Sequence, residues 1–412
     1  PEEGLAMRAL VEPWPPRGVD ALRLAGHVEE ALGAQEEAPP RPPMRADGRQ
    51  VAMQLGLAGT LGEREVLASA FGVEAEDDRD GLEERGLAAP VLADEERHPR
   101  VEVEGLEPGR PYFYRFVAGR ERSATGRAVT APAAGATVDR ARFGVLGCQA
   151  YEQGFYTAHR KAAEERFDFI YCYGDYIYEG RGSRLYNGSG GTFENPRQHL
   201  GGEIYSLDDY RRRYAQYKMD ADLQASHAST AWFCTWDDHE VDNNWVSALD
   251  QDGTPPEVFM LRQQAAMQAW YENMPVRRSA FPRGASLQVY RQAGWGNLLD
   301  LNLLDTRQYR SDQPCDNDWA VTCAGVSDRE AQVLGQAQEQ WLYRNLDRSP
   351  AHWKVLAQQI MLMDLDRNEG PEPGYNLDTW AGYAVPRRRL LERVRDRRID
   401  NLVVLTGGEH QN

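Results

Sequence analysis

Apolar residues gather in short runs along the second half of the chain, and helical stretches separate several of these runs. From Arg142, the sequence RFGVLGC has the pattern of a strand that ends in a tight turn. Thr157–Glu165 has a helical pattern, and the aromatic run Phe167–Tyr173 has the pattern of a buried strand. Strand, helix and strand in this order indicate a crossover unit with a parallel strand pair.

The rest of this half continues with elements of both kinds. We expect three further helices, at Leu207–Met219, Pro256–Asn273 and Asp328–Asp347. We expect four further strands, at Thr230–Thr235, Leu298–Leu304, Lys354–Gln359 and Asn401–Thr406. Residues 137–412 are therefore predicted to form one α/β domain.

The N-terminal third has a different pattern. Residues 1–45 are rich in Pro, Glu and Ala and are expected to be an irregular lead-in, with one helical stretch at Val19–Leu32. Within residues 46–136, the alternating segments Arg100–Val103 and Tyr112–Ala118 flank a Pro-Gly turn, and SATGRAVTAP follows as a closing strand. This pattern favours a small β-sandwich of the immunoglobulin or fibronectin type.

The charge balance narrows the possible partners. The 412 residues carry a formal net charge of −17, which argues against a nucleic-acid groove and against docking on anionic lipid by charge alone. No apolar run is long enough to span a bilayer, and the N-terminal segment PEEGLAMRAL does not have the pattern of a signal peptide. The absence of an initial Met leaves room for a signal peptide that has been cleaved.

The five cysteines fall into three groups. Cys315 and Cys323 flank a polar stretch, which predicts a small disulfide and hence a periplasmic or secreted protein, with two free thiols as the alternative. Cys172 and Cys234 lie in apolar runs and are expected to be inert core thiols. Cys148 ends a strand and belongs with the candidate site.

Four of the predicted strands end in side chains that bind metals or protons. The four endings read LGCQ, GDYIYEG, WDDHEVDNN and TGGEH. Because the carboxyl ends of parallel strands converge on one rim of a sheet, these side chains are expected to share one pocket. The candidate residues are Cys148, Asp175, Tyr178, Asp238, His239 and His410.

The residue types indicate which ions such a pocket prefers. Thiolate, phenolate and imidazole groups favour a transition metal, and carboxylates and amides favour a harder cation beside it. Asp237 is an alternative to the neighbouring Asp238 as a ligand, and a structural role for Asn243 and Asn244 is at least as plausible as ligation. For GDYIYEG taken alone, a turn-capping Asp175 is the simpler alternative.

Five motifs carry a more specific resemblance. LGCQAYEQGFYTAH, YGDYIYEG, WDDHEVDNNW, LLDTRQYRSDQPC and LTGGEH, in this order, resemble the PhoD-like alkaline phosphatase and phosphodiesterase family of calcineurin-like metallophosphoesterases. This family also includes calcium-dependent phospholipase D-type enzymes. VEGLEPGRPYFYRF and GRAVTAP match the family's small N-terminal domain, so the resemblance covers roughly residues 100–412. It implies layered sheets flanked by helices, after a small β-sandwich.

The resemblance also implies metal ligands. By the family's pattern, Cys148, Tyr178 and His410 bind Fe(III), and Asp175 bridges the iron and a Ca(II) ion. Asp238 then binds the second metal.

The implied reaction is hydrolysis of phosphate mono- or diesters by in-line attack of a metal-bound hydroxide or oxide. By the same pattern, His239 faces the phosphate and assists the leaving group, and Arg181 or Arg184 holds a phosphate oxygen. The sequence does not indicate an oligomeric state.

One departure from the family pattern favours other functions. The final motif usually reads Gly-Asp-x-His, but Gly408 stands at the Asp position, and Glu409 replaces that ligand only with a backbone shift. This departure supports a catalytically impaired metal- or phosphate-binding relative as one alternative. A phospholipase D-type enzyme is a second alternative, from within the family, and a carbohydrate- or partner-binding surface protein, supported by the N-terminal sandwich alone, is a third. Because the chain stops at Asn412, directly after this motif, we expect the natural protein to be longer.

The remaining polar candidates have supporting roles. Asp305 and Arg307 are expected to pair and hold a loop near the site, and Gln359 to line the second-metal side. The other histidines are expected to be surface or packing residues: His98, His159, His199, His227 and His352.

Overall fold

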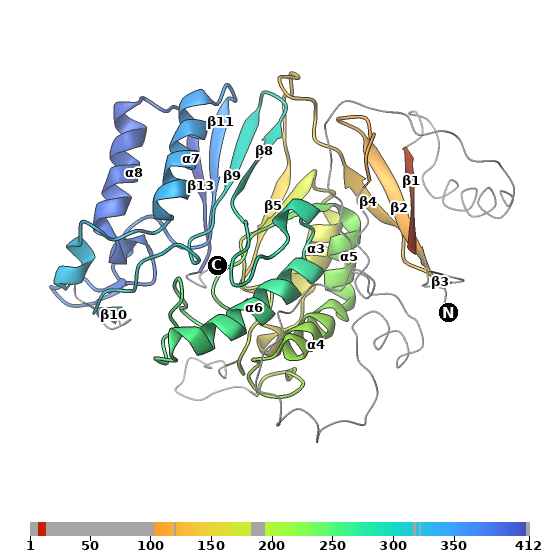
Figure 1. Ribbon diagram of the computed structural model, residues 1–412. Coiled ribbons are helices and arrows are strands. Elements are labelled where there is room, and N and C mark those ends of the chain that lie inside the picture. The colour runs from red at the N-terminus through yellow and green to blue at the C-terminus, as the bar shows by residue number, and fades with distance from the viewer. Residues whose placement is uncertain are drawn as a thin grey trace, which may run out of the picture.

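The computed structural model describes residues 7–13, 103–118, 121–182, 194–315, 319–320 and 323–408, and Figure 1 shows how their elements are arranged. The main body contains two mainly parallel β-sheets with helices on their outer faces. A separate antiparallel sheet, β1, β2 and β4 in Figure 1, lies at the opposite end of the molecule from α8. The expected α/β architecture of layered sheets flanked by helices is confirmed.

The first sheet contains β5 (Phe143–Leu146), β6 (Phe169–Cys172) and β7 (Ala231–Cys234), all parallel. Their last residues lie in register, because Leu146 pairs with Cys172 and Cys172 with Cys234. The three strands therefore end at the same edge of this sheet. Both cysteines are buried, as expected.

The second sheet has the order β13, β11, β9 and β8. The strands β13 (Leu402–Leu405), β11 (Trp353–Ala357) and β9 (Leu299–Leu303) are parallel, and β8 (Arg291–Trp295) is an antiparallel edge strand that the sequence pattern did not reveal. The prediction of a single rim is therefore wrong in one respect, since the strand ends belong to two sheets.

The helices cover the two outer faces. The first group is α3 (Thr157–Glu164), α4 (Leu207–Lys218), α5 (Ala221–Ser229) and α6 (Pro256–Asn273). The second group, α7 (Gly335–Arg348) and α8 (Ala384–Asp396), lies beside β11 and β13 in Figure 1. The short elements are η1 (Tyr151–Gln153), η2 (Arg278–Ala280), η4 (Ala324–Ser327), η5 (Trp380–Gly382), β10 (Trp319–Ala320) and β12 (Tyr375–Asn376).

Three apolar clusters hold these layers together. One packs α4 and α6 on the first sheet through residues such as Tyr214 and Trp270. A second packs α7 and α8 on the other sheet, and a third joins the two sheets through Tyr171 and Leu301. Alternate residues of β6 face opposite sides, so Ile170 packs on the helices while Tyr171 packs on the second sheet.

The small sheet contains β1 (Met7–Pro13), β2 (Pro111–Ala118), β3 (Glu121–Arg122) and β4 (Gly126–Val129), all antiparallel. The expectation that residues 1–45 are irregular is wrong for β1, which pairs with β2 along its whole length. The overall composition of a segment does not reveal a strand whose partner lies about a hundred residues away. The predicted helix Val19–Leu32 lies outside the described residues.

Most helix predictions hold, with three exceptions. The helix expected at Asp328–Asp347 begins only at Gly335, because Asp328 ends the 3₁₀ turn η4 and residues 329–334 form bends instead of helical turns. The helices α5 and α8 were not predicted. Among the described residues, no helix is both long and apolar enough to cross a membrane.

The disulfide prediction is confirmed. Cys315 and Cys323 are joined, with their Cα atoms 5.9 Å apart. This bond closes the loop that leads from the segment around Arg310 into η4.

Candidate metal centre

The backbone at the strand ends brings three loops into contact. Asp175 and Cys148 have positive φ angles of 52° and 50°, and Gly174 has a φ of 128°. A Cβ atom on Gly174 would lie 2.1 Å from the backbone nitrogen of Asp237, so only glycine lets the loop after β6 approach the loop after β7 so closely. The N–H of Cys148 donates to the Gly174 carbonyl at 3.1 Å and fixes the third loop.

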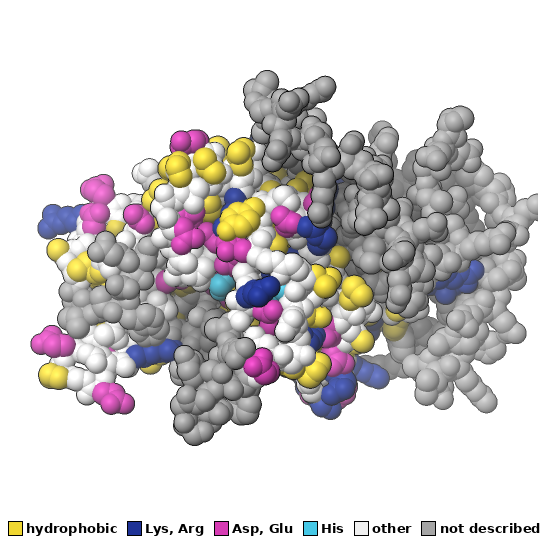
Figure 2. Space-filling model, turned by 90° about the horizontal axis from the view of Figure 1, so that it is seen from below, with side chains coloured by type: hydrophobic (Ala, Val, Ile, Leu, Met, Phe, Trp, Pro, Cys, Tyr) yellow, Lys and Arg dark blue, Asp and Glu magenta, His cyan; other side chains and the backbone are white. Residues whose placement is uncertain are grey.

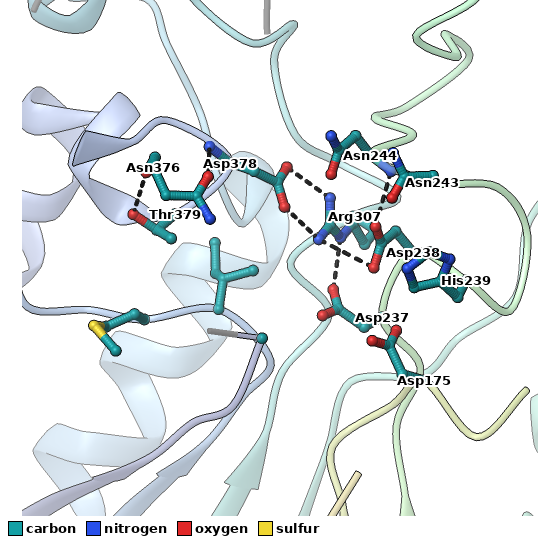
Figure 3. A pocket seen from close by; sticks show the side chains of 13 residues that line it. Asp175, Asp237, Asp238, His239, Asn243, Asn244, Arg307, Asn376, Asp378 and Thr379 are labelled. Carbon is teal, nitrogen blue, oxygen red and sulfur yellow. Dashed lines mark hydrogen bonds and ion pairs between the residues drawn. The ribbon is translucent and has the colours of Figure 1, made fainter. Parts of the chain in front are cut away.

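These loops form one side of a pocket (Figure 3), and the second sheet supplies the other. We call Asp175, Asp238 and His239 the metal wall, and Arg307, Arg310 and Asp378 the arginine wall; all but Arg310 line the pocket. Between the two walls lie backbone or side-chain atoms of the strand ends β11 and β13. Figure 2 shows a face of the molecule on which acidic side chains lie beside basic ones and a histidine.

The metal wall is a compact group of potential ligands. One ligand atom from each of Asp175, Asp238 and His239 lies within 4.8 Å of the others. The Tyr178 hydroxyl donates to Asp175 Oδ2 at 3.1 Å, and the charge of the same carboxylate acts on the neighbouring Cys148 thiol. Five candidates from three strand ends therefore meet around Asp175.

The ring of His239 is held from one side. Its Nδ1 lies 2.7 Å from Glu179 Oε2, and Glu179 Oε1 accepts the backbone N–H of Asn243 at 3.0 Å. The ring also packs on Tyr178, with 4.1 Å between centroids. Burial alone would lower the pKa of His239, but Asp238, Glu179 and Asp175 raise it well above its ordinary value.

Negative charge is concentrated on this side. Burial, followed by the charges of Asp175 and Asp237, raises the pKa of the Cys148 thiol well above its ordinary value. Burial and the charge of Asp175 do the same to the pKa of Tyr178. A cation placed among these groups would reverse both shifts, because a positive charge favours thiolate and phenolate.

The arginine wall contrasts with this arrangement. Both oxygens of Asp378 accept from Arg307, at 2.8 and 2.7 Å, and Arg310 Nη2 donates to Asp378 Oδ1 at 2.7 Å. Gln313 also donates to this carboxylate. Arg307 and Arg310 are both 1% exposed. The charge of Asp378 is therefore balanced by guanidinium groups within the protein.

Arg307 also separates the two neighbouring carboxylates of the DDH sequence. Its Nε donates to Asp237 Oδ1 at 2.7 Å, whereas Nη2 lies 3.5 Å from Asp238 Oδ1. Burial raises the pKa of Asp237 to about 8 despite Arg307. The pKa of Asp238 is lowered, because Arg307 and His239 outweigh the effect of its burial. The geometry favours Asp238 over Asp237 as the ligand.

Two profiles of one protein family match this chain. The profile of the PhoD-like phosphatase family matches residues 143–412, and that of the family's N-terminal domain matches residues 69–132.

The chain belongs to the PhoD-like phosphatase family.

Alkaline phosphatase D of Bacillus subtilis (strain 168) is 44% identical to it over 325 residues, which are 79% of this chain and 54% of that protein. A solved structure described as "Structure of PhoD" superposes with a TM-score of 0.72 at 43% identity and covers 75% of this chain and 59% of the other. The chain thus spans little more than half the length of these relatives.

The family's metal requirement fits the donor set of this chain. Asp175, Asp237 and Asp238 are all 5% exposed or less, and Arg307 is the cationic side chain that contacts Asp237 and Asp238. Buried carboxylates are retained where a counter-charge is available. Cations bound by the carboxylate, imidazole, thiol and phenol groups of this cluster can supply the remaining positive charge.

The outcome differs among the other predicted site residues. Arg181 is described and exposed, whereas Arg184 and His410 lie outside the described residues. Asn243 and Asn244 line the pocket, but their side-chain nitrogens donate to Gln251, at 2.8 and 3.4 Å, which fits a structural role.

Two supporting predictions are wrong. Asp305 does not pair with the Arg307 guanidinium; its carboxylate accepts the backbone N–H groups of Arg307 and Gln308, both at 3.0 Å. Gln359 does not line the pocket with its side chain, which donates to the Leu304 carbonyl and accepts from Thr306. Both residues instead fix the loop that presents Arg307.

The described histidines outside the site match their prediction, and His352 is exposed. His159, His199 and His227 are buried and packed against aromatic rings. His98 lies outside the described residues. Sequence reasoning missed Asp378 and the roles of Arg307 and Glu179, and the only signal was the arginine spacing in DTRQYR.

Proposed function

We propose that this chain is a metal-dependent hydrolase of phosphate mono- and diesters. The observation that carries the proposal is the convergence of Asp175, Asp238 and His239 at the strand ends, with Cys148 and Tyr178 on the same carboxylate. The name of the Bacillus subtilis relative, alkaline phosphatase D, supports the reaction class.

We further propose that two kinds of cation bind here. Cys148, Tyr178 and His410 would hold Fe(III), to which thiol, phenol and imidazole groups are suited; Asp238 would hold a Ca(II) ion, and Asp175 would contribute to holding both ions. When bound, such ions supply an activated water at neutral pH and neutralise phosphate oxygens.

The protein's own groups would then position the ester. Glu179 holds the Nδ1 side of His239, which leaves Nε2 to donate a proton to the departing oxygen. Arg181 or Arg184 would hold a phosphate oxygen through two parallel N–H groups. Arg307, anchored on Asp378, keeps Asp237 and Asp238 apart and oriented.

The proposal extends to the domain arrangement and the location of the protein. Residues 46–136 would form a β-sandwich domain that precedes the hydrolase domain at 137–412, and the described strands β2, β3 and β4 are antiparallel, as such a domain requires. The disulfide between Cys315 and Cys323 supports a periplasmic or secreted location.

The proposal is tested by removing the metals with chelator and measuring hydrolysis of a chromogenic phosphate diester and monoester. We expect activity to disappear with the metals and to return when iron and calcium are restored together. Hydrolysis that survives complete removal of both metals contradicts the proposal.

A second function has one specific observation in its favour. Gly408 lines the pocket with a φ of 81°, and a Cβ atom there would lie 3.8 Å from Asp237 Oδ2. The usual aspartate at this position is therefore missing from the site itself, which favours a metal- or phosphate-binding relative without turnover. Full iron occupancy without hydrolysis of either ester identifies that case.

A further inference from the structure

A buried carboxylate that takes no part in the proposed chemistry links two strand ends of the metal centre. Glu240, next to His239 in the chain, has no exposed surface. Its Oε2 accepts the backbone N–H groups of Asp175 at 3.1 Å and Asp237 at 2.8 Å. Its Oε1 accepts the N–H of Tyr176 at 2.6 Å.

These three bonds tie together the loops that follow β6 and β7. The first loop carries Asp175, and the second carries Asp238. Gly174 allows the loops to touch, since any Cβ atom there would collide with the backbone at Asp237. Asp175 adopts a positive φ, which costs free energy for a residue with a side chain and persists only where its surroundings impose it.

Among the described residues, no cationic side chain forms an ion pair with Glu240. Its oxygens accept only from backbone N–H groups among these bonds, two of which belong to Asp175 and to Asp237, the residue before the proposed ligand Asp238. Loss of one oxygen acceptor would leave a buried N–H group unsatisfied, which destabilises the loop that contains it.

We infer that Glu240 is a positioning residue that sets the spacing between Asp175 and Asp238, and that the affinity of the metal centre depends on it. The inference rests on the proposed metal-binding function. Residues that orient metal ligands without touching the metal commonly change affinity by roughly 10- to 100-fold.

The test is Glu240→Gln, which keeps the shape but replaces one acceptor with an amide that cannot accept the N–H facing it. Calorimetric titration of the metal-stripped full chain with Ca²⁺ should give a dissociation constant roughly 10- to 100-fold higher than that of the wild type. The matched control is Asp220→Asn, because Asp220 accepts two backbone N–H groups at the start of α5 and does not line the pocket. Its calcium affinity should equal that of the wild type.

The outcomes separate the two proposals. If the wild type binds no calcium and purifies without iron, the proposed function fails. If the wild type binds calcium and Glu240→Gln binds it equally well, the proposed function stands and the inference about Glu240 fails, even where the variant unfolds at a lower temperature. A purely structural role would lower the unfolding temperature of the metal-free protein without changing calcium affinity.

Hydrogen exchange of the wild type keeps the inference testable if Glu240→Gln does not fold. The amides of Asp175, Tyr176 and Asp237 should exchange slowly, and Ca²⁺ should slow all three further. Exchange of these amides at the rate of exposed loop residues would overturn the inference.

Discussion

The two walls of the pocket both contain aspartates, yet they balance negative charge in different ways. In the arginine wall, Asp378 accepts from both Arg307 and Arg310, and Gln313 adds a further donor. In the metal wall, Asp175 and Asp238 lie with His239, Tyr178 and Cys148, and burial together with the charge of Asp175 raises the pKa of Cys148 and of Tyr178.

This difference shows why carboxylates alone do not identify a metal site. Asp378 lines the same pocket as Asp175, but its oxygens already have guanidinium partners in a geometry that a metal ion would have to disrupt. The metal wall instead offers oxygen, nitrogen and sulfur atoms of the kinds that cations bind. A site is therefore recognised by what surrounds each carboxylate.

The largest expected effect is the loss of Asp175, around which the metal wall is built. Asp175→Asn should lower kcat/KM for a chromogenic diester by at least about 10³-fold, since a metal contact is commonly worth several kcal/mol at the transition state. Iron and calcium contents should fall together. If Asp175→Asn keeps both metals and its activity, Asp175 is not a metal ligand, and the metal wall does not differ from the arginine wall in this respect.

The next effect concerns the stability of the arginine wall. Arg307→Met would leave the buried Asp237 without its cation and Asp378 with Arg310 alone, and the free energy of unfolding should fall by about 3–5 kcal/mol. Arg212→Met is the control, because its ion pair with Asp209 is exposed and worth less than about 1 kcal/mol. Urea titration measures both. If both variants lose an equally small part of the free energy of unfolding, Arg307 does not compensate the negative charge of the arginine wall.

A third prediction concerns the proton donor of the metal wall. Glu179→Gln keeps the shape but weakens the hold on His239 Nδ1, so kcat should fall about 100-fold while KM changes little. The decrease should be smaller for esters whose leaving group needs no protonation. If good and poor leaving groups suffer equally, His239 does not protonate the departing oxygen.

A fourth prediction tests whether removal of the disulfide lowers the stability of the protein without affecting the metal wall. Replacing Cys315 and Cys323 with Ser should lower the free energy of unfolding by about 2–3 kcal/mol at most, since the bond closes a short loop. Metal content should stay at the wild-type level, because the metal wall comes from the other sheet. Loss of iron in the double variant would show that the walls are not independent.

The smallest expected effect is a gain. Gly408→Asp would add a carboxylate near Asp237 Oδ2, at a positive φ that Asp tolerates better than most residues. Turnover of phosphodiesters should rise about tenfold, or about 1.4 kcal/mol, with little change in iron content. If Gly408→Asp gains no activity and the wild type is already fully active, the absence of an aspartate at position 408 does not support the alternative of a binding protein without turnover.

The metal wall could be predicted because its residues come shortly after the ends of strands in the sequence. Asp175 and Asp238 each come a few residues after a short apolar run, and parallel pairing in register brings such positions together. The distribution of the strands between two sheets could not be predicted, since local periodicity does not determine which strands pair. The edge strand β8 was missed for a similar reason, as its sequence RQAGW has few apolar residues.

The arginine wall was largely invisible in the sequence. Asp378 lies in a loop without a periodic pattern, more than 60 residues after Arg307, and only tertiary packing joins them. Asp305 and Arg307 lie two residues apart, which suggested a side-chain pair, but Asp305 accepts backbone N–H groups instead. The helix α8 was missed because its sequence AVPRRRLLERVRD is mostly charged and buries few residues.

The most direct test of the account is anomalous X-ray scattering at the iron edge from crystals of the full chain grown with calcium. We predict an iron peak in coordination contact with Asp175 Oδ, Cys148 Sγ and Tyr178 Oη, which Cys148→Ala removes. A peak bound by Asp378, or the absence of bound metal at Asp175 in an active enzyme, would contradict the assignment of the metal centre to the loops after β5, β6 and β7.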